Sequence, residues 1–414
     1  MFNRNHKHMN ISKKYWNIAS FLVIALALLS CNQKADQTNN YRDLNKNGRL
    51  DTYEDSTATL GERIEDLLGQ MTLEEKAGLM FNAISGVGMG EGIQRVDSLI
   101  SKVNINHLDM PGMATAKQVL EHNNKLQKIA ENTRLGIPIT FYSDPRHGIQ
   151  KNEMTGENRF HSWWPSELGF GAIGDEALVR EFGDIERQEY LALGIRLALH
   201  PMADLATEPR WFRTYTTFGE DADLSAKLTK AYIQGFQGEQ LGKHSVLCQT
   251  KHFPGGGPQK DGMDAHFASG KEQVYPGGMF DYHLKPFTEG ALPAGTAQLM
   301  LYYGIPVDIT DEQVAFGYNK EIVTDLLRDS LGFKGVVCTD WALVTDNPAK
   351  PASAWGVEHL SPKERVKKII DAGVDMLGGE SCAELVIEVV KEGSITESRL
   401  DESIRRILHD KFVL

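Results

Sequence analysis

The sequence predicts an α/β fold, a TIM-like (β/α)8 barrel, preceded by a lipoprotein-type signal peptide and an EF-hand-like loop. Two observations favour the barrel. Short apolar strands alternate with spans long enough for helices, which is typical of a parallel sheet covered by helices. Several strands also end in charged or aromatic residues, as a barrel with its active site at the carboxyl ends of the strands requires. The predicted strands are Ile137–Tyr142, Ile195–Pro201, Val246–Cys248, Gln298–Tyr302, Gly335–Thr339 and Val374–Leu377.

The composition is that of a globular protein. The chain has 414 residues, of which 41% are hydrophobic, and its 39 glycines bring the apolar share into the normal range. Disorder, collagen-like repeats and coiled coil are therefore excluded for the bulk of the chain. The formal net charge of -12 argues against nucleic-acid binding, which needs a basic surface. Four cysteines are too few for a disulfide scaffold.

Residues 1–30 predict a bacterial lipoprotein signal peptide. An apolar run from Ile18 to Leu29 is too short to span a bilayer but suits the core of a signal peptide. The sequence Leu28-Leu29-Ser30-Cys31 resembles a lipobox, so Cys31 would carry the lipid. We therefore expect a cell-envelope protein, periplasmic or surface-exposed, that is attached to a bacterial membrane through its lipid. A plain secretory signal is the alternative. The run follows four basic residues, Arg4, Lys7, Lys13 and Lys14.

Residues 31–59 predict a polar tether followed by a calcium loop. Residues 43–54, DLNKNGRLDTYE, fit the pattern D-x-[DN]-x-[DN]-G-x5-E at every specified place. Gly48 takes the sharp turn, and Glu54 can bind through both oxygens. Only one flanking helix is evident, which favours a structural calcium ion; a hydrophilic linker with Asx turns is the alternative. The predicted metal ligands are Asp43, Asn45, Asn47, Arg49, Asp51 and Glu54.

Three of the predicted strands lead into residues that can do chemistry. The first runs into Asp144, the second into Lys251-His252, and the third into Asp340-Trp341. One such ending could be a buried ion pair or a helix cap, but three together favour a common site. Carboxylates beside tryptophans, without a phosphate-binding loop, indicate a carbohydrate site, because aromatic faces stack on sugars while charged groups bind hydroxyls.

The segments that carry these residues resemble a known family. From about Leu60 to Leu414 the chain is similar to the N-terminal barrel domain of glycoside hydrolase family 3, so residues 60–414 are expected to form one (β/α)8 domain. The blocks that match, among them EPRWFRTYTTFGED and GFKGVVCTDW, occur in the family's order. They are Arg63–Met80, Leu135–Gly148, Glu208–Asp221, Lys251–His266, Gly332–Trp341 and Ala372–Leu377.

The resemblance implies a retaining, exo-acting β-glycosidase, most similar to β-glucosidases, that hydrolyses terminal non-reducing β-linked sugars of an oligosaccharide or glycoside. Asp340 would be the nucleophile that forms a covalent glycosyl intermediate. No cofactor for catalysis is implied. The residues implied to bind or flank the sugar are Asp144, Arg213, Lys251, His252, Tyr303 and Trp341.

The proton donor has several candidates. In most members of that family it is a glutamate on a second domain that follows the barrel, and a second polypeptide could supply it here. Some single-domain relatives that act on N-acetylglucosaminides use an Asp-x-His pair, which Asp264 and His266 match. A histidine oriented by an aspartate can donate a proton near neutral pH. Glu380, after the last strand, is a further carboxylate.

Two classes of function therefore remain. The first is an active β-glycosidase, either of the β-glucosidase type or a β-N-acetylglucosaminidase that uses the Asp264–His266 pair. The second is a truncated, inactive or sugar-binding surface lipoprotein.

Overall fold

The structure is a computed structural model that describes residues 41–84, 93–109, 115–144, 147, 151–152, 156–157, 161–347 and 350–414. The predicted signal peptide, with Cys31, lies outside these residues. Residues Asp43–Leu414 form one compact unit. Within the described ranges no helix combines the length and the apolar character that crossing a membrane requires.

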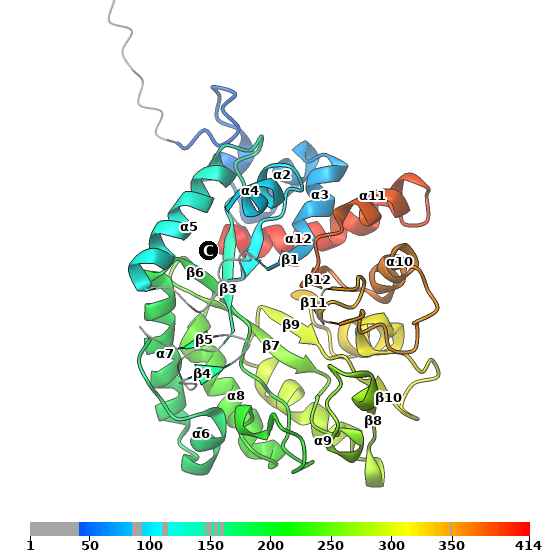
Figure 1. Cartoon of the computed structure of the whole chain (residues 1–414). Coiled ribbons are helices and arrows are strands. Elements are labelled where there is room, and N and C mark those ends of the chain that lie inside the picture. Colours follow the sequence, from blue (N-terminus) through cyan, green and yellow to red (C-terminus); the bar gives the residue numbers. More distant parts are fainter. Residues whose placement is uncertain are drawn as a thin grey trace, which may run out of the picture. The chain divides into compact units, whose positions relative to one another are not determined.

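Eight parallel strands close into a barrel (Figure 1). Each strand pairs with the next one along the chain, and the last pairs with the first, with Phe81 opposite Leu377. The predicted TIM-like barrel is thus confirmed. The strands are β1 (Phe81–Ala83), β2 (His107–Asp109), β3 (Thr140–Ser143), β6 (Ile195–Ala198), β7 (Leu247–Phe253), β9 (Gln298–Leu301), β11 (Val336–Trp341) and β12 (Met376–Gly378).

Helices surround the barrel and connect its strands (Figure 1). The helices begin at capped residues in several places; Thr72 and Ser361, for example, each form a capping box with a glutamate three residues later. The α-helices are α2 (Leu60–Gln70), α3 (Leu73–Leu79), α4 (Ile93–Ser101), α5 (Ala116–Glu131), α6 (Glu167–Ile173), α7 (Glu176–Ala192), α8 (Ala222–Gln237), α9 (Phe280–Lys285), α10 (Pro362–Ala372), α11 (Ala383–Lys391) and α12 (Glu397–Val413).

Shorter elements lie in the connections. Two π-helical segments, η6 (Pro286–Ala291) and η8 (Glu321–Ser330), cover the outside of the barrel. Two small sheets pair β4 (Lys151–Asn152) with β5 (Gly156–Glu157), and β8 (Glu272–Gln273) with β10 (Ile305–Pro306). The 3-10 turns are η1 (Thr52–Glu54), η2 (Thr214–Thr216), η3 (Lys260–Gly262), η4 (Ala268–Gly270), η5 (Pro276–Gly278) and η7 (Phe316–Tyr318).

A buried carboxylate ties the C-terminal helix to the barrel. Asp375, just before β12, is fully buried. It accepts hydrogen bonds from Arg328 Nη2 at 2.5 Å and from Arg406 Nη1 at 2.8 Å. The hydroxyl of Ser403 on α12 and the backbone N–H of Val337 on β11 complete its partners, at 2.7 and 2.9 Å. Asp375 therefore links β11 and the start of β12 to α12 through hydrogen bonds.

Candidate active site

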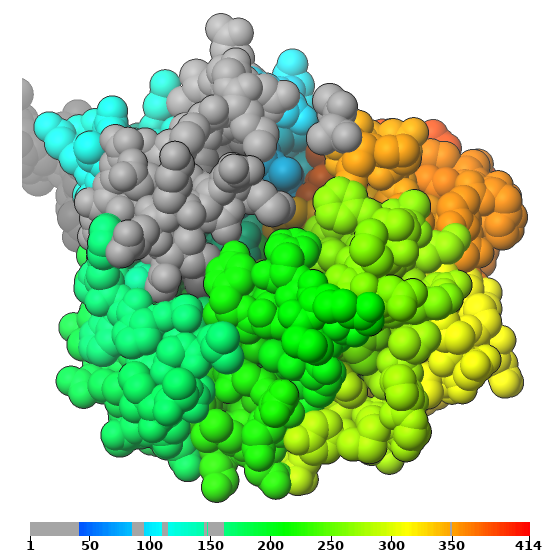
Figure 2. Space-filling view, turned by 60° about the horizontal axis from the view of Figure 1, so that its bottom comes forward, coloured from blue at the N-terminus to red at the C-terminus, as the bar shows by residue number. Residues whose placement is uncertain are grey.

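The carboxyl ends of the barrel strands bring the predicted site residues to one end of the molecule. Asp144 follows β3, and Asp340 and Trp341 close β11. Lys251 and His252 lie within β7, which extends further than the sequence predicts. Figure 2 shows the segments that follow β7, in yellow-green, between the green surface of residues near 200–230 and the orange surface of residues near 350–380.

One carboxylate oxygen of Asp340 accepts a hydrogen bond, and the other accepts none from the described residues. Its side chain is buried, with 6% of the residue exposed. Oδ1 accepts the backbone N–H of Trp341 at 2.8 Å. Oδ2 lies 3.7 Å from Nε2 of His252 and has no hydrogen-bond partner in the described part of the chain. Tyr303 fixes the backbone beside it, because its hydroxyl accepts the Trp341 N–H at 3.0 Å and donates to the Trp341 carbonyl at 2.9 Å.

Lys251 and Asp144 form an ion pair that joins β7 to β3. The distance from Nζ to Oδ1 is 2.6 Å, and the side chains are 8% and 29% exposed. An ammonium next to a carboxylate presents donors and acceptors side by side, which is what a sugar with adjacent hydroxyls requires.

His252 is oriented by Asp204, a residue that was not predicted. Asp204 is fully buried, and its Oδ2 lies 2.6 Å from Nδ1 of the imidazole. Burial lowers the pKa of His252 below its usual value despite the neighbouring carboxylate. The neutral ring therefore donates Nδ1–H to Asp204 and turns the Nε2 lone pair toward Arg213, whose Nη1 is 3.4 Å away.

Arg213 precedes η2 in the loop after β6. Burial works against its charge, but the combined effect of Tyr302 and the carboxylates of Asp264, Asp340 and Asp204 outweighs it and raises the pKa of Arg213. By contrast, Arg210 pairs with Glu208 at 2.8 Å, and its side chain is 63% exposed. Arg210 thus braces the loop while Arg213 points to the site.

Asp264 and His266 are in contact on the loop after β7. Nδ1 of His266 is 2.5 Å from Oδ1 of Asp264. The other carboxylate oxygen accepts Trp211 Nε1–H at 2.7 Å and the Tyr302 hydroxyl at 3.0 Å. Burial opposes ionisation of Asp264, but the hydrogen bonds and charge of His266 together with the charge of Arg213 outweigh it and lower the pKa. The imidazole is 4.5 Å, between ring centroids, from Tyr303, which also contacts Trp341.

Similarity to known proteins assigns the chain to a family. Residues 65–409 match the model of the glycosyl hydrolase family 3 N terminal domain. The chain belongs to glycosyl hydrolase family 3. It is 48% identical over 385 residues to the beta-glucosidase C of Emericella nidulans, covering 91% of this chain and 62% of that protein. It is 41% identical over 403 residues to a periplasmic beta-glucosidase/beta-xylosidase of Dickeya chrysanthemi, covering 90% of this chain and 61% of the relative.

Solved structures share the barrel fold. A β-glucosidase from Erythrobacter marinus superimposes with a TM-score of 0.73 at 24% identity, covering 87% of this chain and 46% of that one. A family 3 β-N-acetylglucosaminidase from Paenibacillus gives a TM-score of 0.68 at 24% identity, covering 83% and 62%. The chain thus spans about three fifths of the length of the Emericella and Dickeya relatives.

Lys350 is a second residue of this family 3 site that was not predicted. Its Nζ donates to the His266 carbonyl at 3.2 Å and to Ser353 Oγ at 2.8 Å, and it lies 4.9 Å from the centroid of the Tyr303 ring. Trp355 Nε1–H donates to the carbonyl of Ala265 at 2.8 Å. The segment after β11 therefore supports the loop that carries the Asp264–His266 pair.

Both carboxylate oxygens of Glu380 accept hydrogen bonds from the segment after β11. It is 3% exposed. One oxygen accepts the backbone N–H groups of Val344 and Thr345, at 2.7 and 3.0 Å, and the other accepts the Thr345 hydroxyl at 2.5 Å. These bonds shape the segment after β11 and leave Glu380 a structural role there.

Residues 43–54 form a compact, hydrogen-bonded loop. Both carboxylate oxygens of Asp43 accept backbone N–H groups, from Asn47 at 3.1 Å and from Gly48 at 2.9 Å. Gly48 has φ of +79°, which makes the sharp turn at the sixth position. Tyr53 is buried, and its hydroxyl donates to the carbonyl of Leu135 at 3.4 Å, which attaches the loop to the barrel domain.

The other predicted ligands gather in the same loop. The side-chain amides of Asn45 and Asn47 both meet Oδ2 of Asp51, at 2.6 and 2.5 Å. Their oxygens accept the backbone N–H groups of Asn47 at 3.1 Å and of Arg49 at 2.9 Å. Glu54 accepts the backbone N–H of Asp51 at 3.2 Å. The side chain of Arg49 pairs with Asp51 and is 76% exposed, so only its backbone carbonyl suits a metal. The donor set fits calcium.

Proposed function

We propose that this chain is the barrel of a retaining, exo-acting β-glycosidase of the β-glucosidase type, which hydrolyses terminal non-reducing β-linked sugars. The observation that carries the proposal is Asp340, a buried carboxylate at the end of β11 with one oxygen held and the other without a partner among the described residues. The relatives named β-glucosidase support it.

The proposed reaction proceeds in two steps. Asp340 Oδ2 attacks the anomeric carbon, the bond to the leaving oxygen breaks, and an acid gives that oxygen a proton. Water, deprotonated by the same group, then releases the sugar from Asp340. The Lys251–Asp144 pair, Arg213 and His252 bind hydroxyls, and Trp341 supplies an apolar face.

We propose His266 as the proton donor, with Asp264 accepting its Nδ1–H at 2.5 Å. In the protonated ring, Nε2–H is then free to face the leaving oxygen. This geometry supports β-N-acetylglucosaminidase activity as the second candidate. A glutamate from a second polypeptide is the competing source of the proton, and a sugar-binding lipoprotein without turnover is the alternative outside enzymes.

Covalent trapping tests the nucleophile. A 2-fluoro glucoside should label the peptide that contains Asp340, and Asp340→Asn should abolish both labelling and turnover. Asp261→Asn, a change at a mostly exposed aspartate, is the matched control. A label on another residue, or normal turnover by Asp340→Asn, would refute the assignment.

Leaving-group dependence tests the proton donor. His266→Ala should lower kcat/KM by about 10²–10⁴-fold on glycosides with poor leaving groups and much less on activated aryl glycosides. Nitrophenyl glucosides, xylosides and N-acetylglucosaminides should be compared in the same assay. Unchanged activity on poor leaving groups would rule out His266 as the donor, and turnover that requires a second polypeptide would assign the proton to that polypeptide. The absence of any turnover, with or without it, would favour the sugar-binding alternative.

We also propose a structural calcium ion in residues 43–54, with the six ligands named above. Adding Ca²⁺ to EDTA-treated protein should raise the Tm. Glu54→Gln should abolish this response, while Glu62→Gln, an exposed change on α2, should keep it. A Tm that does not change when calcium is added would refute the site.

We further propose that Cys31 carries a lipid and attaches the protein to the bacterial cell envelope. Cells fed a labelled fatty acid should incorporate it into the wild-type protein. Cys31→Ser should lose the label and leave the membrane fraction; retention of the label would refute the assignment.

A further inference from the structure

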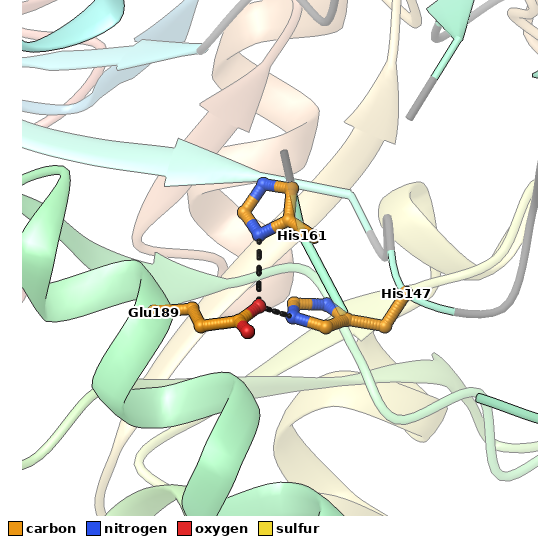
Figure 3. Close-up of side chains that lie close together, drawn as sticks. All are labelled: His147, His161 and Glu189. Atoms are coloured by element: carbon orange, nitrogen blue, oxygen red, sulfur yellow. Dashed lines mark hydrogen bonds and ion pairs between the residues drawn. The ribbon is translucent and has the colours of Figure 1, made fainter. Parts of the chain in front are cut away.

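Outside the candidate active site, His147, His161 and Glu189 converge on one point (Figure 3). One ligand atom from each side chain lies within 4.8 Å of the other two. Nε2 of His147 is 2.6 Å, and Nδ1 of His161 is 3.5 Å, from the same carboxylate oxygen, Oε2 of Glu189. His147 follows β3, His161 precedes α6, and Glu189 lies on α7, so three separate segments meet here.

The side chains of the cluster are mostly buried. The side chains of His147 and His161 are 0% and 3% exposed, and that of Glu189 is 30% exposed. Two imidazoles and one carboxylate are a donor set that suits zinc and similar divalent transition metals. Neither the glycosidase mechanism nor the calcium loop uses these residues.

A second layer of contacts supports this donor set. The other ring nitrogen of His147, Nδ1, contacts Oε1 of Glu186, which is fully buried on α7. The second oxygen of Glu186 accepts the hydroxyl of Tyr232 on α8 at 3.0 Å. Histidines that bind metals commonly donate their second N–H to a carboxylate, which fixes the tautomer and orients the ring. The backbone N–H of Ser162 donates to Oε2 of Glu189 at 3.0 Å and helps to orient that carboxylate.

The two carboxylates of the cluster require positive charge beside them. Glu186 and Glu189 would together place two negative charges around the two imidazoles. Uncompensated charge in a protein interior is costly, so these carboxylates need either a divalent cation or protons on the histidines. A protonated His147 between two glutamates is thus the metal-free alternative.

We propose that His147, His161 and Glu189 bind one divalent transition-metal ion, zinc or an ion of similar chemistry, with Glu186 orienting His147. The ion would have a structural role. His147 lies three residues after Asp144, so the metal would attach the segment that carries this member of the Lys251–Asp144 pair to α7.

Metal titration of the full chain, purified without an affinity histidine tag, tests the site. A chelator selective for transition metals over calcium removes the ion while excess Ca²⁺ keeps the loop at residues 43–54 loaded. Zn²⁺ should then bind at one equivalent by calorimetry, and Co²⁺ should produce visible absorption from a His-ligated site. His161→Ala and Glu189→Gln should abolish both signals, whereas His359→Ala, at an exposed histidine, should keep them.

Further measurements separate the metal from the protonated alternative. Glu186→Gln should weaken Zn²⁺ binding by about 10–100-fold, as loss of an orienting carboxylate does elsewhere. Wild-type protein that binds neither Zn²⁺ nor Co²⁺, with both ring nitrogens of His147 protonated by NMR, would overturn the proposal. Stoichiometric binding retained in both ligand variants would also overturn it. Neither readout depends on glycosidase activity, and the wild-type titration decides the question even if a variant does not fold.

Discussion

Asp204 acts on the candidate site through the ring and backbone of His252 and through the backbone N–H of Gly256. By accepting Nδ1–H at 2.6 Å, it leaves Nε2 as an acceptor facing the guanidinium of Arg213. An acidic residue soon after a predicted strand is the signal that identified Asp144. The same signal after residues 195–201 would have identified Asp204. Lys350 has no such signal, because it reaches His266 only through the fold of a loop.

We expect Asp204→Asn to lower kcat/KM by roughly 10²-fold or more, because an amide nitrogen there favours the wrong tautomer of His252. The thermal stability should change less than the activity, and Asp261→Asn should leave both unchanged. Steady-state kinetics beside thermal denaturation measure this. If Asp204→Asn lowers the Tm but the folded fraction of the variant has normal kcat/KM, Asp204 contributes to stability and not to catalysis.

Glu167 should make stability depend on pH. Burial raises its pKa from 4.5 to about 7, with Glu186 adding to the shift and Lys251 opposing it. Between these values the folded state keeps a proton that the unfolded state has lost, so stability falls as the pH rises from about 5 to 8.

We expect Glu167→Gln to remove this dependence. It should stabilise the protein by roughly 3 kcal/mol relative to wild type at pH 8 and by little at pH 5. Denaturant unfolding at the two pH values measures the difference, with the exposed Glu176→Gln as the control. Equal pH dependence in wild type and Glu167→Gln would contradict the assignment.

At the scale of elements, the apolar content of a strand decides whether the sequence reveals it. The six predicted apolar runs correspond to barrel strands. β1 and β2 were not predicted, because polar Asn82 or His107 interrupts each of these three-residue strands, whereas the equally short β12 lies in an apolar run. β7 continues through Lys251 and His252, because backbone pairing with its neighbours overrides the polarity of those side chains.

Gly378 in β12 should be needed for the position of Trp341. A Cβ there would lie 2.1 Å from Cε3 of the indole and 2.6 Å from the carbonyl of Thr339. We expect Gly378→Ala to destabilise the fold by about 1–3 kcal/mol and to raise KM as the indole shifts. Gly69→Ala on α2, where a Cβ meets nothing within 4 Å, should be neutral or slightly stabilising. Denaturation and kinetics check both, and an unchanged KM would argue against a role of Trp341 in binding.

For the whole molecule, parallel strands explain why so much of the site was predictable. All eight carboxyl ends meet at one end of the barrel, so side chains placed after separate strands must approach one another. Strand ends are visible in the sequence. Contacts between loops, such as Trp211 with Asp264, are not, because they depend on how each loop folds over its neighbours.

Asp375 should be important for the stability of the whole barrel domain. Asp375→Ala would leave the guanidinium groups of Arg328 and Arg406 without their buried partner, and we expect a loss of about 3–5 kcal/mol. Asp371→Ala removes only an exposed pair with Lys367 and should cost no more than about 1 kcal/mol. Thermal denaturation of both variants measures the contrast, and equal Tm values would contradict the role of Asp375.

Closure of the barrel determines when the candidate site forms during folding. Asp144, Lys251 and Asp340 come from β3, β7 and β11, so no short stretch of nascent chain contains the site. Pairings between segments so distant in sequence form slowly, and β12 must meet β1 before the ring is complete. A partly folded chain can therefore hold native helices and still bind no sugar. Ligand binding would report on completed closure during refolding more directly than helix content does.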